Sequence, residues 1–521
     1  MNSSWLNEVA VIQGECIKPP LGCDCDWPGR ESIDTIAAMS HLTLADVVDD
    51  LQRSRQLTRI AAEVNPDLEL AAIAQRAADE SGPAILFGRI AGRDSPLVIN
   101  LLGSLERINR ALELKSLDDL RSRAEQLLQP ASPAGWLDSL RLSPPQARWA
   151  PRIVKNGVCQ QVVHLASDVN LGQFFNVKWW PEEEAPSLPA ALVFVQAPDD
   201  AWRSMEFCSA TLLDQQRLLL GWEPHRSLAR LWRKQTERRE RLPVAMSLGG
   251  HPAELLAAAA PLGVQVDRWA LCGWLRDRSC DLVRSRTLPL EVPADAEIIL
   301  EGYLDPSAPP VPAPRRAGLS GFYSLPGDGV VMHVTAVTHR TNPLPIAIAP
   351  RKPPHDLGVM RAAMLEALKP LLLGIVPGLV DFHLPAATAC RNVAIVSIEK
   401  SLPQQARQIA GALWALEPWM FARLLVVVDA DADVCNKAEI LHRITSHADL
   451  SRDTFQQSMP CELDHHASPA SGVAALMGID ATRKMPAEQG HTWPNELKSD
   501  QRIAEQVNAR WESFAVGGNG R

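Results

Sequence analysis

The sequence predicts a mixed α/β protein of several domains, with an α/β domain at each end and a strand-rich domain between them. Three observations predict this architecture. The chain has 521 residues, 46% of them hydrophobic, which is enough for several buried cores. Helical and strand patterns alternate up to about residue 150, and strand patterns dominate from there to about residue 335. Longer helices and buried strands then return, as expected for a second α/β domain.

Composition and charge narrow the classes of partner. The formal net charge is −9, so the chain has no positive excess for binding nucleic acid or anionic membranes. The start of the chain lacks the pattern of a signal peptide, and its most apolar later stretch, "MLEALKPLLLGIVPGLV", is interrupted by Lys369 and two prolines. The ten cysteines are scattered, without the spacing of a zinc site or a disulfide framework. We therefore expect a cytoplasmic protein with reduced thiols, no integral membrane segment and no nucleic-acid partner.

The N-terminal part divides into two regions. Residues 1–40 contain turn formers such as "PPLGCDCDWPG" and are expected to form an N-terminal extension. Residues 41–150 are predicted to form an N-terminal α/β domain. Its helices are expected in "LTLADVVDDLQRSRQL" and in "DLELAAIAQRAADE", the second capped by Asp67, and its strands in "LTRIAAEV" and "SGPAILFGRI".

Residues 151–335 are predicted to form a central domain around a split or barrel-like sheet. Its expected strands are "VCQQVVHL", "ALVFVQA", "SMEFCSATLL", "RLLLGWE", "LPVAMSLGG" and "AEIILEGYL". One helix, "HPAELLAAAAPLG", interrupts them, with a proline at its start. The Pro-rich stretch Asp305 to Gly321 is predicted to be a functional or mobile loop, because loops of this length inside a domain usually are one or the other.

Residues 336–521 are predicted to form the C-terminal α/β domain. Apolar runs such as "RNVAIVSIEK" and "RLLVVVDADADV" suit buried strands. The closing segment, "DQRIAEQVNARWESFAV", is predicted to be an amphipathic helix that packs on a partner subunit.

Two polar clusters in this region have more than one interpretation. The alternating carboxylates of Asp429, Asp431 and Asp433 could hold Mg²⁺ at the end of a strand, or they could lie in a solvated loop that caps a helix. The run 464–466, Asp-His-His, could bind a metal or be structural. The sequence has no GxSxG elbow, P-loop, HExxH motif or dinucleotide fingerprint after a strand, so the common hydrolase, kinase and dehydrogenase classes have no support.

The most specific motif is "ASPASGVAALMGIDATRK", residues 467–484. It resembles the closing signature ASPxSGxxxxMGxDATxK of the UbiD family of reversible decarboxylases. Further segments that resemble the family follow its order along the chain: "SGPAILF", "CQQ", "WPEEEAP", "EVPADAEIILEGYL" and "SRDTF".

This resemblance implies a fold, a cofactor and a reaction. The implied fold has an N-terminal α/β domain, a central split β-barrel of flavin-reductase type and a C-terminal α/β domain. The implied cofactor is prenylated FMN, bound through its phosphate with Mn²⁺ and K⁺, and the substrates are small aromatic or α,β-unsaturated acids. An arginine and two carboxylates position the acid and supply a proton, while the cofactor acts as electron sink. The resemblance also implies a homodimer or higher homo-oligomer formed through the C-terminal region.

The family's flavin hairpin corresponds to "SMEFCSATLLDQQRLLLGWEPHR", residues 204–226. Trp222, His225 and Arg226 match its return strand, and Phe207, Cys208 and Ser209 occupy its outward strand. By resemblance, these six residues and Arg268 are the candidate cofactor-binding positions. Serine at the position of the family's catalytic arginine cannot form a bidentate clamp on a carboxylate.

Other family positions are replaced as well. Ser204 stands where the family has a metal-binding Asn, and Arg268 stands where it has a metal-binding Glu. Ala313 and Gly318 fall at the positions of the two catalytic carboxylates. We therefore assign no catalytic residue and no metal ligand by resemblance, although Arg268 could itself bind the flavin phosphate or be a salt-bridged structural residue.

Three functions stay open from the sequence. The first is an active carboxy-lyase with a rearranged site, in which other charged residues replace the lost ones: Glu206, Glu223, Arg203, Arg315 or Arg316. The second is a catalytically inactive protein that binds a flavin or acts as partner subunit of an active homologue. The third is a separate ligand-binding function, in which tryptophans stack on an aromatic ligand or instead fill the core: Trp179, Trp180, Trp222 and Trp269.

Overall fold

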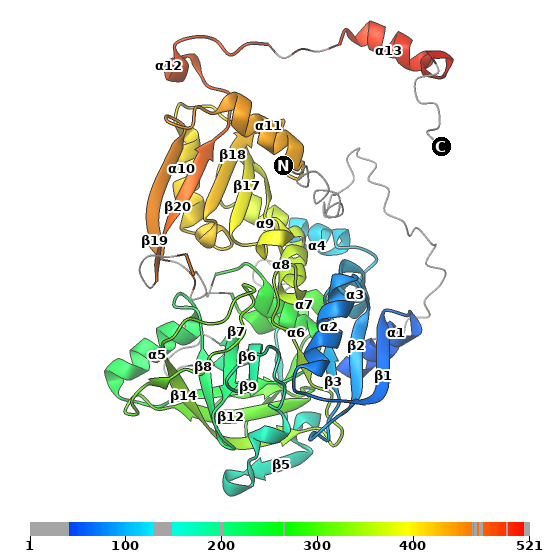
Figure 1. Ribbon diagram of the computed structural model, residues 1–521, viewed down its shortest axis with the longest axis vertical. Coiled ribbons are helices and arrows are strands. Elements are labelled where there is room, and N and C mark those ends of the chain that lie inside the picture. The colour runs from blue at the N-terminus through cyan, green and yellow to red at the C-terminus, as the bar shows by residue number, and fades with distance from the viewer. Residues whose placement is uncertain are drawn as a thin grey trace, which may run out of the picture.

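The computed structural model describes residues 41–128, 148–196, 203–263, 266–460, 462, 466–467, 472–495, 497 and 499–514. Figure 1 shows the N-terminal region in blue beside a green barrel, with the yellow and orange C-terminal region above them. The expected extension 1–40 lies outside the described residues. Among the described residues, no helix is long and apolar enough to cross a membrane.

The N-terminal region is a small sheet covered by helices. The sheet has the order β1-β2-β3-β15, with β1 and β2 parallel. The predicted helices and strands are confirmed, but the predicted Asp67 cap is wrong: Leu68 is the N-cap of α2 and makes no side-chain cap. The elements are α1 (Leu44–Arg53), β1 (Leu57–Val64), α2 (Glu69–Asp79), β2 (Ala84–Ile90), β3 (Leu97–Ile99), α3 (Leu105–Ala111), α4 (Asp118–Leu128) and β15 (Ile346–Ala347).

The central region is a closed antiparallel barrel, as the strand-rich sequence predicts. Its strands follow the order β12-β9-β6-β7-β8-β14, and pairing of β14 with β12 closes the ring. Alternate side chains fill its interior, because successive residues of a strand face opposite sides. The strands are β6 (Ser187–Val195), β7 (Ser204–Leu212), β8 (Arg217–Gly221), β9 (Leu242–Ser247), β12 (Ile298–Leu304) and β14 (Asp328–His339). The expected domain boundary at residue 335 therefore falls inside β14.

Shorter elements surround the barrel. A three-stranded sheet has the order β11-β10-β4, and β5 and β13 each pair with β14. These elements are β4 (Arg152–Val154), β5 (Val162–Leu165), α5 (Ser227–Arg238), α6 (Pro252–Ala259), α7 (Arg268–Arg276), β10 (Asp281–Arg284), β11 (Glu291–Pro293) and β13 (Val311–Pro312).

The C-terminal region is an α/β layer that packs on the rest of the chain through α8. Its sheet has the order β16-β17-β18-β20-β19, and β17, β18 and β20 are parallel. The elements are α8 (Asp356–Ala367), α9 (Lys369–Leu373), β16 (Leu379–His383), β17 (Val393–Ile398), α10 (Gln405–Trp414), β18 (Leu424–Asp429), α11 (Lys437–His447), β19 (Thr454–Pro460) and β20 (Val473–Asp480).

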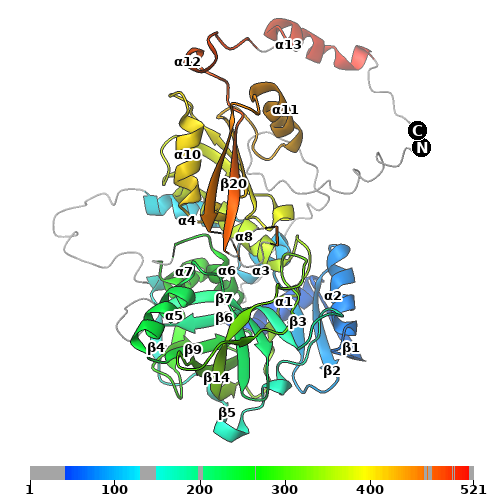
Figure 2. The ribbon, with the colours of Figure 1, turned by 60° about the vertical axis from the view of Figure 1, so that its left-hand side comes forward.

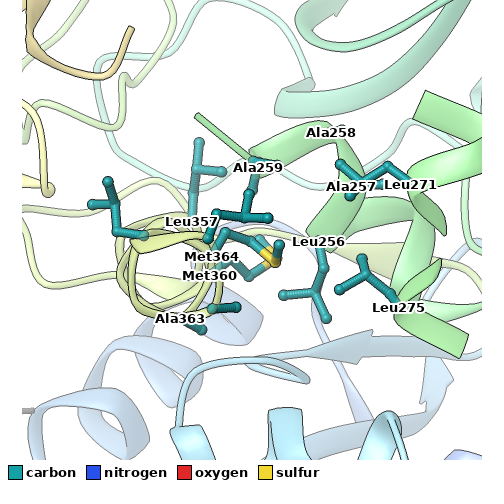
Figure 3. Packing of buried hydrophobic residues seen from close by; sticks show 14 of the residues in the cluster. Leu256, Ala257, Ala258, Ala259, Leu271, Leu275, Leu357, Met360, Ala363 and Met364 are labelled. Carbon is teal, nitrogen blue, oxygen red and sulfur yellow. The ribbon is translucent and has the colours of Figure 1, made fainter. Parts of the chain in front are cut away.

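A continuous hydrophobic core joins α8 to the barrel helices α6 and α7. Figure 3 shows Leu357, Met360 and Met364 of α8 packed against Leu256 of α6. Each of these side chains is almost fully removed from water, which stabilises such a contact by roughly 1.5–3 kcal/mol per large apolar side chain. This packing fixes α8 relative to the barrel.

The predicted closing helix is present as α13 (Gln501–Ala509), reached through the short α12 (Pro486–Gln489). None of its residues is buried, and both ribbon views place it away from the three regions (Figures 1 and 2). Ile503 and Trp511 expose about half of their surface to solvent, at 54% and 50%.

Candidate functional site

A cleft with a volume of about 150 Å³ lies where the barrel meets the C-terminal region. Strands β6 to β8 form one wall, the loop after β13 forms a second, and the start of α8 with loops of the C-terminal region form the third. The lining residues are Pro189, Ala190, Phe207, Cys208, Ser209, Gly221, Trp222, Glu223, Arg226, Arg316, Leu319, Ser320, His355, Leu357, Arg361, Ala389, Arg391, Asn392, Arg423 and Glu462.

The cleft is strongly positive. Among the described lining residues, arginines outnumber glutamates five to two. The only other ionisable side chains in the lining are Cys208 and His355. Burial raises the pKa of the Cys208 thiol to about 12, and burial lowers the pKa of His355 to about 3, so both are neutral near pH 7. A cleft with this charge favours an anionic ligand.

Both glutamates of the cleft are paired with the same arginine. Arg391 Nη1 lies 3.3 Å from Glu223 Oε1, and Arg391 Nε lies 3.5 Å from Glu462 Oε1. Arg423 Nη2 donates to Glu462 Oε2 at 2.9 Å. The guanidinium of Arg391 also stacks over the ring of Phe421. Burial disfavours the charge of Arg391, but its two glutamates more than compensate and raise its pKa.

Arg226, which lines the cleft, belongs to a second charged group with His225 and Glu417. Arg226 Nη1 and His225 Nε2 each lie 3.3 Å from Glu417 Oε1. Burial raises the pKa of Glu417, but Arg226 and the hydrogen bond with His225 outweigh it and lower this pKa to about 2. Burial lowers the pKa of His225. Glu417 is therefore ionised at neutral pH, and it compensates the charge of Arg226.

The structure brings five of the seven candidate cofactor-binding residues to the cleft. Phe207, Cys208 and Ser209 lie on β7, and Trp222 and Arg226 follow β8. The hydroxyl of Ser209 donates to the Gly221 carbonyl at 3.1 Å across the β7–β8 pair. His225 and Arg268 are not among the lining residues, and the role of all seven toward a flavin stays a prediction.

Arg268 begins α7 beside the end of α6. Its Nη1 donates to the carbonyl oxygens of Ala257 and Ala260, both at 3.0 Å, and its Nη2 donates to that of Leu262. Ala257 lies in the last turn of α6, and Ala260 and Leu262 lie in the turn that follows, so Arg268 caps the end of α6 and holds this turn. Burial and the nearby Arg226 lower the pKa of Arg268 to about 10, which leaves it charged at neutral pH.

Ala313 and Gly318 lie outside the cleft, but their loop contributes to it. Arg316, Leu319 and Ser320 of this loop line the cleft. Glu183 holds the loop in place, because its Oε1 accepts the backbone N–H of Ala317 at 3.0 Å. The predicted functional loop therefore reaches the cleft through other residues than the two positions aligned with the family's carboxylates.

Of the proposed substitutes for the lost charges, only Glu223 and Arg316 line the cleft. The other three are engaged elsewhere. Arg203 pairs with Glu291, Arg315 pairs with Glu182 at the surface, and the buried Glu206 accepts the backbone N–H of Leu228 at 2.6 Å.

The candidate tryptophans divide between core and cleft. Trp179 and Trp269 are buried, and Trp179 Nε1 donates to the Ser187 carbonyl at 2.7 Å. Trp180 Nε1 donates to the Pro350 carbonyl at 2.7 Å. Trp222 lines the cleft and is the one member of the four that a ligand there could touch.

The sequence interpretation missed the charged residues that the C-terminal region contributes. Arg361, Arg391, Arg423 and Glu462 lie far from the family's flavin hairpin in sequence. One signal could have found Arg361. Helix α8 is apolar on nearly every side, and a cation inside such a helix needs a counter-charge or a polar cavity.

The residues at the family's metal positions do not fit Mn²⁺. Ser204 donates to Glu206 at 3.1 Å, and Arg268, at the position aligned with the family's metal-binding Glu, is a cation that donates to backbone carbonyls. Within the described residues, no group of three or more His, Cys, Asp or Glu side chains is placed to hold a metal ion.

The two polar clusters of the C-terminal region have no metal-binding arrangement in the described residues. In the acidic run, Asp429 and Asp431 both pair with Arg443 and Arg483. Residues 464 and 465 of the second cluster lie outside the described residues.

Three domain models of one family match the chain. The 3-octaprenyl-4-hydroxybenzoate carboxy-lyase N-terminal domain matches residues 48–127, the Rift-related domain matches 152–353, and the C-terminal domain matches 358–481. Together these matches cover more than half of the chain.

Several solved structures share the fold. Vanillic acid decarboxylase from Sedimentibacter hydroxybenzoicus in closed form matches with a TM-score of 0.81 at 21% identity, over 92% of this chain and 100% of that chain. In open form, the same enzyme matches with a TM-score of 0.68. The UbiD-class enzyme HmfF from Pelotomaculum thermopropionicum, in complex with FMN, matches with a TM-score of 0.68 at 24% identity, over 90% and 100% of the two chains. 3,4-Dihydroxybenzoic acid decarboxylase from Klebsiella pneumoniae matches with a TM-score of 0.64 at 19% identity, over 89% and 99%. With its barrel, its flanking α/β regions and all three domain matches, this chain belongs to the UbiD family of carboxy-lyases.

Proposed function

We propose that this chain decarboxylates a small aromatic or α,β-unsaturated carboxylic acid in the arginine-lined cleft. The excess of arginine in this cleft, at the face of β7 and β8, is the observation that carries the proposal. Guanidinium groups bind carboxylates through paired hydrogen bonds. The solved relatives include decarboxylases of vanillic acid and of 3,4-dihydroxybenzoic acid, both aromatic acids.

Prenylated FMN is the cofactor that this proposal requires, and the cleft offers suitable residues for it. Phe207 and Trp222 would contact its flat ring system, and Arg226 or Arg316 would bind its phosphate. When bound, the cofactor supplies an electron sink for the carbon that loses CO₂. Because the family's metal positions do not fit a metal here, phosphate binding would depend on arginine alone.

Glu223, Arg391 and Glu462 form the group that could handle the proton. They are one arginine and two carboxylates in mutual contact within the cleft, the same types of side chain as in the family's catalytic set. The bond between the substrate carbon and its carboxylate breaks, CO₂ leaves, and a proton takes its place on that carbon. Glu223 lies beside Trp222 on the barrel side. Its carboxylate would take up a proton from water and deliver it to that carbon.

A second candidate function is binding without turnover, with a flavin or as partner subunit of an active homologue. The replacement of the catalytic arginine by Ser209, and of both catalytic carboxylates by Ala313 and Gly318, favours it. Catalytic groups must lie within a fraction of an ångström of their productive positions, so relocated groups do not guarantee activity.

A cofactor inventory followed by a turnover assay separates these two functions. The full chain is co-expressed with a prenyl-FMN synthase, and its absorbance, released flavin and bound Mn are measured. Bound prenyl-FMN and CO₂ release from an aromatic or unsaturated acid, both without Mn, would support decarboxylation. Glu223→Gln should then keep the flavin and lose turnover. Flavin without turnover on any acid would support the second function, and absence of flavin would reject the proposed mechanism.

Assembly and location complete the proposal. The exposed apolar side chains of Ile503 and Trp511 suit a contact between two copies of the chain, and we propose a homodimer or higher homo-oligomer in the cytoplasm. Removal of residues from 499 onward should then lower the number of subunits per particle, calculated from the mass measured by light scattering. An unchanged number of subunits would contradict the role of this segment.

A further inference from the structure

Arg361 differs from its neighbours on α8. The helix begins at Asp356, after His355, whose Nδ1 accepts the backbone N–H of Gly358 at 3.1 Å. Most side chains of α8 are apolar, and Figure 3 shows Leu357, Met360 and Met364 packed into the core. Arg361 is part of the cleft lining instead. The helix thus places a cation in the cleft, beside side chains that pack into the apolar core.

The other arginines of the cleft have partners within the protein. Arg226 pairs with Glu417, Arg391 pairs with Glu223 and Glu462, and Arg423 pairs with Glu462. Arg316 also has an interaction partner. Arg361 makes no hydrogen bond or ion pair with any residue in the described part of the chain. Its guanidinium therefore has all of its donors available to a ligand.

The surroundings of Arg361 leave its charge poorly compensated. Burial lowers its pKa to about 9, the like charges of Arg391 and Arg226 contribute in the same direction, and the charge of Glu223 offsets them only in part. This pKa is still well above neutral pH, so the side chain is charged there. A buried cation without a counter-ion is costly, and an anion that enters the cleft would remove part of this cost.

We propose that Arg361 binds the carboxylate of the acid that occupies the cleft. The family's carboxylate clamp is absent from β7, where Ser209 stands. Arg361 would supply this clamp from α8, another wall of the same cleft. This inference rests on the proposed function for the identity of the ligand. The same guanidinium could also bind a phosphate, so the experiment has to separate the two anions.

The test uses the purified full chain, both free of flavin and reconstituted with FMN. Isothermal titration measures binding of cinnamate and benzoate, with cinnamamide and benzamide as neutral counterparts and inorganic phosphate as the second anion. The variants are Arg361→Gln, Arg361→Lys and, as a matched control, Arg59→Gln, which removes an exposed arginine on β1.

We expect wild type and Arg59→Gln to bind the acids equally and to ignore the amides. Arg361→Gln should weaken acid binding by at least about tenfold, as expected for loss of a bidentate charged contact. Arg361→Lys should fall between them, because it keeps the charge and loses the fork. Since Arg361→Gln removes a buried charge that has no ion-pair partner among the described residues, its melting temperature without ligand should equal or exceed that of wild type.

Three results would overturn the inference: equal acid affinity of wild type and Arg361→Gln, absence of acid binding in both forms of wild type, or an effect of the variant on phosphate alone. A lower melting temperature of both Arg361 variants would show a structural role. Failure of the proposed function has a different signature, because missing prenyl-FMN or missing CO₂ release leaves acid binding to Arg361 unaffected.

Discussion

Replacement of Glu183 by glutamine should destabilise the barrel and loosen the loop that carries Arg316. The carboxylate of Glu183 is buried and accepts four hydrogen bonds. Its Oε2 accepts the backbone N–H groups of Trp179 at 2.6 Å and Trp180 at 3.1 Å. Its Oε1 accepts the hydroxyl of Ser187 at 2.8 Å and the N–H of Ala317 at 3.0 Å.

The magnitude follows from what an amide can replace. In the Glu183→Gln variant, the side-chain amide oxygen can serve the two tryptophan N–H groups, and the Ser187 hydroxyl can rotate to accept from the new NH₂ group. The N–H of Ala317 then has no acceptor, which costs about 1–3 kcal/mol. The bonds from the two tryptophan N–H groups change from a charged to a neutral acceptor and lose about 1 kcal/mol each, whereas the Ser187 bond is replaced. The total is about 3–5 kcal/mol.

Thermal unfolding of the purified protein measures this effect. For a domain of roughly 150–250 residues, such as the central region, a loss of about 3–5 kcal/mol lowers Tm by roughly 10 °C. Glu182→Gln is the matched control, because Glu182 is exposed and its pair with Arg315 lies at the surface, where such pairs contribute at most about 1 kcal/mol. A fall in Tm below about 3 °C for Glu183→Gln, or equal falls for both variants, would refute the reasoning.

Three further variants test other contacts. The pKa of Glu417 in the folded protein is about 2, below its ordinary value of 4.5, so its stabilising contribution is complete above pH 4.5 and is lost as the pH falls toward 2. The difference in unfolding free energy between wild type and Glu417→Gln, measured in urea, should therefore shrink over this pH range, and a constant difference would contradict this. Arg391→Met should cost about 3 kcal/mol in urea unfolding, because it removes the cation between the half-buried Glu223 and the buried Glu462 and leaves Glu462 only Arg423 as a partner within the described part of the chain. Addition of Glu462→Gln should recover part of this loss, and no recovery would argue against this explanation. Gly302→Ala should destabilise the barrel by about 1–3 kcal/mol in the same assay, because a Cβ there would lie 2.2 Å from a carbonyl oxygen of β14. The control is Gly411→Ala in α10, where a Cβ meets nothing within 4 Å, so this variant should be neutral or stabilising. Equal effects of the two variants would show that the close contact is not the cause.

Much of the fold could be predicted from the sequence because local patterns specify it. The apolar runs that became β17 and β18 are buried on both faces, as parallel strands between helices are. The predicted cap of α2 failed for a local reason. Asp67 lies one residue too early, and Leu68 takes the N-cap position with a positive φ of 67°, which no side-chain pattern announces.

The candidate site could be predicted only on its barrel side. Phe207 and Trp222 belong to one hairpin that resembles the family's flavin hairpin, so their position in the sequence was enough to predict that they lie at the site. Arg361 and Arg391 reach the same cleft from α8 and from the start of β17, and nothing near them in sequence indicates which side of the barrel they will meet. Their placement depends on the packing of α8 against α6, which is a tertiary effect.

The arginines of the cleft are divided between two bodies of the protein. Arg226 and Arg316 belong to the barrel, whereas Arg361, Arg391 and Arg423 belong to the C-terminal region. An anion that contacts both sets can do so only while the two bodies are together, so its binding energy also holds them together. By thermodynamic reciprocity, whatever separates the two bodies must weaken the affinity for that anion by the same factor. Affinity for such an anion is therefore thermodynamically linked to the packing of α8 against the barrel, and a substitution far from the cleft that alters this packing would change both.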